Sequence, residues 1–198
     1  MSSIFHICKK GTLKLGAGPI GALSCFLLVA TSFLSAHAQE QISIAAKNGH
    51  PITTKELNSI YEDQSWRWKD GAAYFSAQRH AFKAWAGSGA KASYAEGSWS
   101  AEDPGRLCFH ATWYGVKGHG TSTTCLEHRT DDKNIYQRRL SKGEWYIFSH
   151  QPPLPEDEIK KIESGDRVSE GYQANKRYVA EHGSGNGHHA VRRRRKAS

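Results

Sequence analysis

Short aromatic segments separated by turn residues recur along the chain, and the clearest of them is Ser65–Ala77, which reads SWRWKDGAAYFSA. Asp70-Gly71 lies between two aromatic runs, and such a loop favours a tight β-hairpin because a type I′ turn needs positive φ at both central positions. With that turn, Arg67 pairs with Tyr74 and Trp66 with Phe75. Alternation then predicts one face made of Trp66, Trp68, Ala73 and Phe75, and the opposite face made of Arg67, Lys69 and Tyr74.

Comparable strands are expected farther along the chain, at Ala81–Trp85, Ala92–Ser100, Arg106–Trp113, Ile135–Leu140 and Glu144–His150. Within the second of these, Tyr94 and Trp99 have opposite parity, and a bulge at Gly97 would return both to one face. The last two strands form a hairpin around Lys142-Gly143 that sets Leu140 opposite Trp145.

Helices are expected only near the two ends of this strand-rich region. Thr53 and Glu56 have the spacing of a capping box at the start of a short helix. Residues 155–165 begin with Pro and acidic residues and end with Lys and Gly, as short helices do, and Arg167–Glu181 is expected to form another helix. Since no βαβ alternation occurs, we expect a mainly β fold, an antiparallel meander curled into a small barrel or sandwich.

The first part of the chain has the features of an export signal. Met1–Ala38 contains basic residues, an apolar run at Ile20–Leu34 and a small-x-small site ending at Ala38. The alternatives are an uncleaved membrane anchor, for which the apolar run is short, and a lipoprotein at Cys25, which the preceding residues match poorly. We therefore expect a periplasmic or secreted protein with no transmembrane span after cleavage.

Cys108 and Cys125 are the two cysteines that remain beyond the predicted signal. An even number of cysteines in an oxidising compartment favours a disulfide. The two residues are equidistant from Val116-Lys117, so a hairpin turning there sets them opposite each other and pairs Arg106 with Glu127. A redox role is the alternative, but no C-x-x-C spacing is present.

The net charge of +8 comes mainly from the C-terminal end of the chain. Residues 39–191 carry equal numbers of basic and acidic side chains, whereas the tail contains a basic run made of Arg192, Arg193, Arg194, Arg195 and Lys196. We therefore expect no nucleic-acid domain. The basic run either contacts an anionic envelope surface or is simply solvated.

The domain organisation follows from these features. It consists of a signal peptide at 1–38, a loosely held leader at 39–50, one β-rich domain at 51–181 and a disordered basic tail at 182–198. The domain is long enough to bury one core, and the composition of the tail is typical of disorder. Oligomeric state is left open.

Several separated motifs resemble the bacterial family catalogued as domain of unknown function 995. The resemblance covers Pro51–Val179 and rests on Trp66-Arg67-Trp68-Lys69-Asp70-Gly71, Ala84-Trp85, Tyr94 with Gly97 and Trp99, Leu107-Cys108-Phe109, Cys125, His128-Arg129, Tyr136, Gly143-Glu144-Trp145-Tyr146 and Gly165-Asp166-Arg167-Val168. It implies a secreted envelope protein of Gram-negative bacteria. It supplies no catalytic residues, and the basic tail lies outside it.

Candidate chemistry is sparse. The histidines lack the spacing of a zinc site, so no metal and no cofactor are expected. His110 and His128 can lie on neighbouring strands, and Glu127 or Asp131 could orient one of them. No nucleophile motif accompanies them, and these four residues are the candidates for a hydrolase acting on envelope material.

The aromatic residues favour binding over catalysis. Most of the tryptophans are expected in the core, but aromatic rings also line ligand sites and stack on sugars. Trp113, Tyr74 and Arg67 are the candidate ligand-binding residues. The leading hypothesis is a non-catalytic domain that binds a ligand or a component of the envelope, such as a glycan or a lipid.

Overall fold

The computed structural model describes residues 37–140 and 142–183. The chain divides into Met1–Ala38, of which only residues 37 and 38 are described, and Gln39–Ser198. The predicted signal peptide up to residue 36, and the tail from residue 184 with its basic run Arg192–Lys196, lie outside the described residues.

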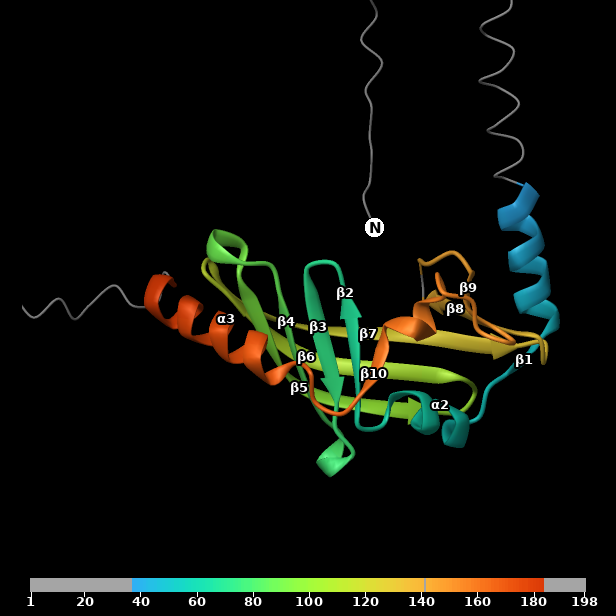
Figure 1. The fold of residues 1–198 in the computed structure, drawn as a ribbon, viewed down its shortest axis with the longest axis horizontal. Helices are drawn as coiled ribbons and strands as arrows, with labels where there is room; N and C mark the ends of the chain where they lie inside the picture. The colour runs from blue at the N-terminus through green and yellow to red at the C-terminus, as the bar shows by residue number, and fades with distance from the viewer. Residues whose placement is uncertain (1–36, 141, 184–198) are drawn as a thin grey trace, which may run out of the picture. The chain divides into compact units, whose positions relative to one another are not determined.

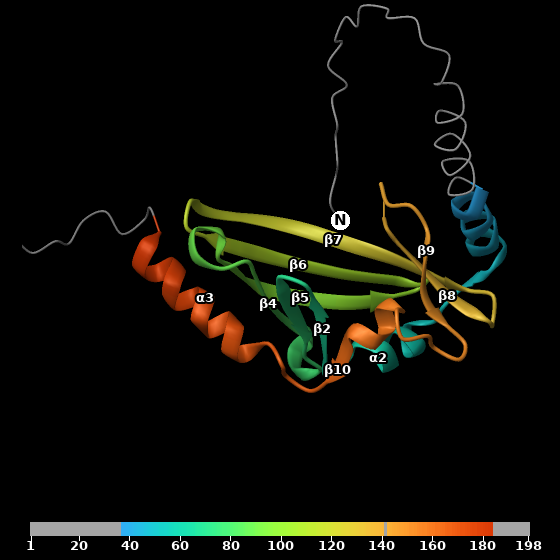
Figure 2. The same ribbon diagram turned by 45° about the horizontal axis from the view of Figure 1, so that its top comes forward.

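The mainly β fold is confirmed as a ten-stranded antiparallel sheet that curls into an open half-barrel (Figures 1 and 2). Its order is β10-β2-β3-β4-β5-β6-β7-β8-β9, with β1 paired to β7. The strands are β1 His50–Pro51, β2 Gln64–Trp68, β3 Gly71–Phe75, β4 Ala81–Ala86, β5 Ser93–Glu102, β6 Arg106–Gly115, β7 Gly118–Thr130, β8 Asn134–Arg139, β9 Tyr146–His150 and β10 Ile162–Ser164.

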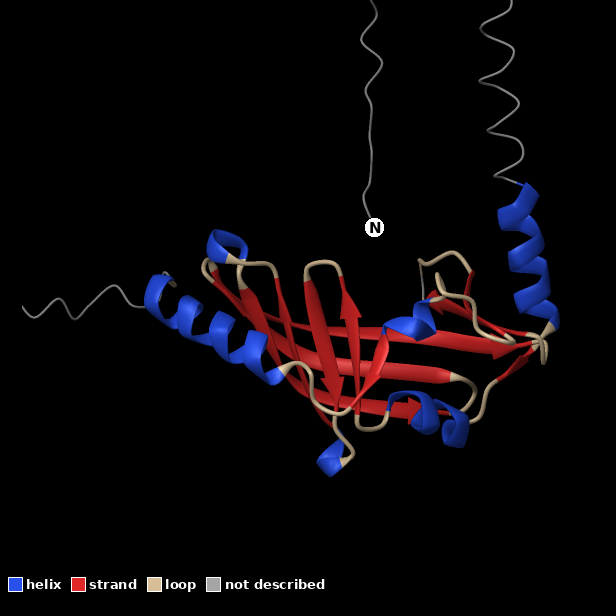
Figure 3. Ribbon diagram, viewed as in Figure 1, coloured by secondary structure: helices blue, strands red, loops and turns tan. Residues whose placement is uncertain are grey.

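Helices are few and short (Figure 3). They comprise residues 37–48, and α2 Thr54–Tyr61, α3 Ser169–His182 and the 3₁₀ segments η1 Gln78–His80, η2 Gly89–Lys91 and η3 Glu158–Lys161. The predicted capping box is present, because the Thr53 side chain accepts from the Glu56 amide while the Glu56 carboxylate accepts from the Thr53 amide. The predicted C-terminal helix corresponds to α3.

Both faces of the sheet are covered by helices. On the inner face, Leu57 and Tyr61 of α2 pack into the main core with Phe75. On the outer face, Tyr172 of α3 packs with Ala72 in a second cluster. Side chains of both parities along one strand can therefore be buried.

That arrangement explains why the predicted bulge at Gly97 is wrong. The pairing of β5 with β4 and β6 runs without a break, so Tyr94 lies on the outer face with Tyr172 while Trp99 lies in the inner core. Gly97 has a different role, since a Cβ there would lie 2.0 Å from the His110 carbonyl oxygen. Close approach of the neighbouring strand requires this glycine.

The central hairpin exists, but its turn is Lys69-Asp70, so the predicted register is wrong by two residues. Trp66 pairs with Ala73 and Trp68 with Gly71. Because the shift is even, the predicted faces hold: Trp66, Ala73 and Phe75 all contribute to the inner core. Gly71 is needed as a strand residue, since a Cβ there would lie 2.6 Å from the Trp68 indole.

The β6–β7 hairpin matches the prediction. Cys108 pairs with Cys125 and Arg106 with Glu127, and the connection lies at residues 116–117. The two Cα atoms of the cysteine pair are 4.1 Å apart and the sulfur atoms are 2.10 Å apart. The pair is therefore able to form the predicted disulfide.

Three segments differ from expectation. Residues 155–165 form only the short η3, because Ile162–Ser164 instead pairs with β2 as an edge strand. β8 and β9 form the expected hairpin, but Gln137 pairs with Tyr146, so Leu140 is not the partner of Trp145. The leader is helical up to residue 48, and its Ala46 is buried in a third cluster with Trp145.

Candidate functional site

The four candidate catalytic residues do not meet. His110 lies on the outer face of β6, exposed, with its Nδ1 2.7 Å from the Thr123 hydroxyl. His128 points inward from β7 and is fully buried. Strand alternation therefore puts the two imidazoles on opposite faces of the sheet, and neither can act on a substrate held by the other.

The two candidate carboxylates are occupied by other partners. Glu127 accepts from the Arg138 guanidinium on the outer face at 2.5 Å. Asp131 accepts from the Tyr136 hydroxyl at 2.7 Å and from the Asn134 amide within its own turn. Neither carboxylate is bonded to an imidazole, so neither orients His110 or His128 as a catalytic triad requires.

His128 instead belongs to a buried polar cluster inside the half-barrel. Its Nε2 lies 2.9 Å from the Tyr61 hydroxyl and 2.5 Å from the Gln137 amide nitrogen. The Gln137 carbonyl oxygen accepts in turn from the Tyr146 hydroxyl. Since the amide can only donate, Nε2 is the acceptor and the neutral ring carries its proton on Nδ1.

Burial strongly favours the neutral form of this imidazole. Desolvation lowers the pKa of His128 to about 3, and the nearby Gly105 backbone opposes this only in part. Burial also raises the pKa of Tyr61 well above its usual range. The cluster stays uncharged at ordinary pH, and it is part of the core rather than a proton-transfer site.

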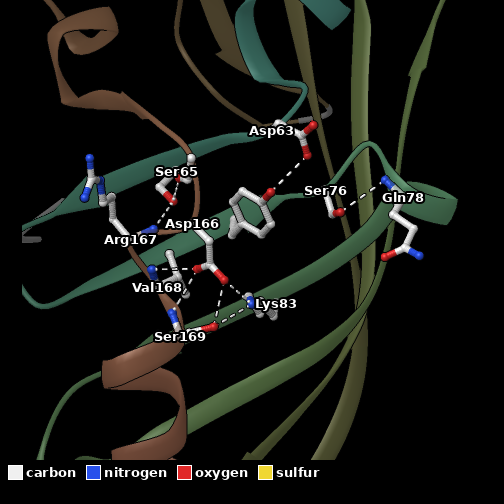
Figure 4. Close-up of polar contacts among 11 residues, drawn as sticks. Asp63, Ser65, Ser76, Gln78, Lys83, Asp166, Arg167, Val168 and Ser169 are labelled. Carbon is white, nitrogen blue, oxygen red and sulfur yellow. Dashed lines mark hydrogen bonds and ion pairs between the residues drawn. The ribbon is translucent and has the colours of Figure 1, made fainter.

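Tyr74 and Arg67, two of the candidate binding residues, are used in contacts near the start of α3 and at the sheet edge. The Tyr74 hydroxyl donates to Asp63 at 2.9 Å, and the Lys83 ammonium lies 5.2 Å from the centre of the Tyr74 ring (Figure 4). Arg67 forms an exposed ion pair with Glu163 across β2 and β10. Both residues stabilise the fold locally.

Figure 4 also shows a Lys–Ser–Asp group at the start of α3. Lys83 donates to Ser169 at 2.7 Å and to Asp166 at 2.5 Å, and Ser169 donates to the same carboxylate. Partial burial disfavours the carboxylate charge, but the bonds from Lys83, Ser169 and two backbone amides outweigh it and lower the pKa of Asp166 to about 2. A paired ammonium cannot serve as a base for the Ser169 hydroxyl, so this group holds α3 to the sheet.

Trp113, the third candidate, lies in a different environment. It borders a solvent-open hollow of about 390 Å³ at the end of the β6–β7 hairpin, which is also lined by Ser93, Gly115, Lys117, Gly118 and Gly120. Trp113 packs against the core and remains partly exposed. Ser93, Gly115, Gly118 and Gly120 share its inner face by strand alternation.

Small residues create this hollow. Gly118 has a φ of +132°, which glycine adopts readily, and a Cβ on either Gly118 or Gly120 would have no heavy atom within 4 Å. Gly120 is paired with Trp113 across the hairpin. Neither packing nor backbone conformation requires a glycine at position 120, and its absent side chain leaves the space beside Trp113 open.

Residues 114 and 119 also border the hollow, but their rings lie on the outer face. Tyr114 stacks on Tyr94 with 4.8 Å between ring centres, and His119 lies 5.8 Å from Tyr114. Trp113 is thus the aromatic side chain on the inner side. No carboxylate lines the hollow, so its chemistry is that of a ring platform, backbone amides and one ammonium.

Two further findings concern the described residues alone. Within 37–140 and 142–183, no group of three or more His, Cys, Asp or Glu side chains could hold a metal ion. No helix in that part of the chain is long and apolar enough to cross a membrane.

Sequence reasoning identified Trp113 but missed the buried cluster and the Lys83 group. His128 is two residues beyond Leu126, which pairs with Leu107 in the core, so strand alternation alone could have assigned it to the core. Lys83 and Asp166 are distant in sequence, and no local pattern brings them together.

Comparison with known proteins identifies a family. A family model described as Protein of unknown function (DUF995) matches residues 24–168, most of the chain. The match begins earlier than the resemblance noted above and ends at Val168, just before α3. No curated protein and no solved structure matches the chain.

Proposed function

The chain belongs to the DUF995 family, and we propose that it is a non-catalytic domain that binds a ligand or a component of the bacterial envelope in the hollow beside Trp113. One observation carries this proposal. The hollow combines a partly exposed indole with a floor of small residues and contains no carboxylate. Such a site offers stacking and hydrogen bonding to a ligand, but no acid–base pair.

The candidate catalytic residues support the same view. His110 and His128 lie on opposite faces of the sheet. Glu127 accepts a hydrogen bond from Arg138, and Asp131 accepts one from the Asn134 amide within its own turn. A hydrolase needs a nucleophile or an activated water beside an oriented base. No observation on these residues favours hydrolysis.

Two proposals concern the two ends of the chain. We propose that Met1–Ala38 directs export and is removed, so that N-terminal sequencing of periplasmic protein begins at Gln39; a chain that still begins at Met1 would refute this.

We also propose that Arg192–Lys196 contacts anionic envelope surface.

The binding proposal is tested by filling the hollow. Gly120→Val adds a branched side chain where open space now exists, and valine suits a strand. Small molecules that co-purify with the protein are identified by mass spectrometry. A bound molecule should be recovered from the wild type at near-stoichiometric amount and be lost from the variant.

A matched control lies on the same strand. Ser122 is exposed and shares the inner-face parity of Gly120, but does not line the hollow. Ser122→Val should retain the bound molecule. Equal recovery from wild type and Gly120→Val would show that the ligand binds elsewhere.

A further inference from the structure

The floor of the hollow continues across the sheet toward β2. Ser93 pairs with both Gly115 and Ala86, and Ala86 pairs in turn with Gly71, which pairs with Trp68. No side chain between Trp68 and the hollow along this row is larger than serine. The row is therefore made of small side chains along the inner face at the turn end of the strands.

A second indole borders the far end of this row. Trp68 is 39% exposed and, with Ile44 and Leu154, is one of three large hydrophobic side chains exposed among the described residues. A Cβ on Gly71 would lie 2.6 Å from the Trp68 ring, so the ring lies against the glycine backbone. Its position is fixed by that contact although much of its surface faces solvent.

Three lysines surround the same end of the sheet. The turns after β2, β4 and β6 lie together at one end (Figure 1) and contain Lys69, Lys91 and Lys117, all exposed. Within the described part of the chain, no reported ion pair involves any of them. Asp70 is the sole carboxylate in these three turns.

The opposite end carries less positive charge. The turns after β3, β5 and β7 contain three aspartates, Asp103, Asp131 and Asp132, against Arg79 and Lys133. An anionic ligand is therefore attracted more strongly to the end that bears the two indoles.

We propose that the ligand is a linear, negatively charged saccharide that lies along the small-residue row, with sugar rings on Trp113 and Trp68 and its acid groups near Lys69, Lys91 and Lys117. This rests on the proposed function of the hollow. Four strand spacings separate β2 from β6, or about 19 Å along a flat sheet and less along a curled one. A short chain of several sugar units spans that distance.

The chemistry favours a saccharide over other anionic ligands. Indole faces bind the apolar face of a sugar ring, while backbone amides and Ser93 can bond its hydroxyls. The hollow is open and its floor is partly polar, so it does not suit an acyl chain. Single-stranded nucleic acid is the competing class and is included in the test below.

The test uses two ligands of the same sugar backbone, one charged and one neutral: a hexamer of galacturonic acid and its methyl ester. Binding to the full mature chain is measured by calorimetry at low ionic strength. The acid should bind at least about tenfold more tightly than the ester, because exposed charge pairs each contribute up to about 1 kcal/mol. Trp68→Ala should weaken binding of both, since stacking does not depend on the carboxylates.

Two triple variants separate local charge from net charge. Lys69→Gln/Lys91→Gln/Lys117→Gln should lower the affinity for the acid and leave the affinity for the ester unchanged. Lys55→Gln/Lys133→Gln/Lys160→Gln removes the same charge from exposed positions elsewhere and should leave affinity within about twofold. The basic tail is common to both, so its contribution cancels.

Each contrary outcome is decisive. Equal affinity for acid and ester overturns the role of the lysines while leaving the proposed function of the hollow intact. Binding of neither, or tighter binding of a single-stranded DNA oligomer, overturns the saccharide assignment. The proposed function of the hollow is tested separately, by whether a molecule co-purifies with the wild type and is lost from Gly120→Val.

Discussion

At the scale of single residues, His128 shows how a polar group is kept inside an apolar core. A buried imidazole without partners would cost several kcal/mol. Here Nε2 accepts from Tyr61 or Gln137, although Nδ1 has no hydrogen-bond partner within the described residues. Adding a proton would bury an unpaired charge, and this is why the pKa of His128 falls to about 3.

We predict that His128 makes the folded state less stable as the pH is lowered. The ordinary pKa is near 6.5 and the folded value is about 3, so the unfolded chain binds more protons between these limits. Stability is therefore lost as pH falls through this window, by up to about 1.4 kcal/mol per pH unit for one proton. The window of Asp166, from its ordinary pKa of 3.8 down to about 2, overlaps only the lowest part of this range.

The measurement is an NMR titration of the His128 ring from pH 7 to 5, combined with urea unfolding of wild type and His128→Gln. The ring signals should not move, and the free energy of unfolding should depend less on pH in the variant. A midpoint near pH 6.5 for His128 in the folded protein would contradict the account.

At the scale of elements, the C-terminal helix is attached to the outer face by polar contacts. Asn175 is nearly buried, and its amide nitrogen lies 3.0 to 3.1 Å from the carbonyls of Ala86, Gly87 and Ser93. At the other end of α3, Lys83 bonds Asp166 and Ser169. These contacts place Tyr172 against the sheet.

We predict that Lys83→Gln loosens α3 locally. The Lys83–Asp166 pair is about one-third exposed on each side, so its loss should cost only about 1 kcal/mol of stability. Hydrogen–deuterium exchange should increase for residues 169–182 and stay unchanged in β6 and β7. Equal exchange in α3 of wild type and variant would show that the apolar contacts suffice.

The predicted disulfide joins β6 to β7. Replacing both Cys108 and Cys125 by alanine opens a loop of 17 residues, which should lower the free energy of unfolding by about 3 kcal/mol. Reduction of the wild type should have a similar effect and leave the double variant unchanged. Recovery of two free thiols from periplasmic protein by non-reducing peptide mapping would refute the bond.

Elements with local signals were predictable from sequence, and those that depend on distant contacts were not. Turn spacing and cysteine symmetry specified the β6–β7 register, and Thr53 with Glu56 specified the start of α2. The position of the first turn was missed because Gly71 serves close packing under Trp68 rather than positive φ. β10 was missed because its pairing with β2 joins segments about 100 residues apart.

The same distinction applies to the candidate site. Trp113 was selected as an aromatic residue on a predicted strand, but its neighbours Ser93 and Lys117 come from different turns and strands. Only the fold brings them to one hollow. Tyr94 and Trp99 were predicted to share one face of the sheet. They do not, because both faces are covered, and no local sequence pattern shows that.

At the scale of the whole molecule, the charge is divided between a balanced domain and a basic tail. We predict that deletion of Gly187–Ser198 leaves the melting temperature unchanged and weakens binding to anionic vesicles. Exposed charges are screened over about 8 Å at physiological salt, so the lost binding should be the salt-sensitive part. If the truncated chain binds such vesicles as tightly as the mature chain at low salt, the tail is simply solvated.

The central claim is that the hollow beside Trp113 binds a ligand, and the indole N–H signals of the six tryptophans test it most directly. Nitrogen-15 NMR spectra of the mature chain are recorded while a periplasmic small-molecule extract is added. The account predicts that the Trp113 signal shifts while those of Trp99 and Trp145, each 3% exposed, stay in place. An unmoved Trp113 signal, or shifts confined to the buried indoles, would contradict it.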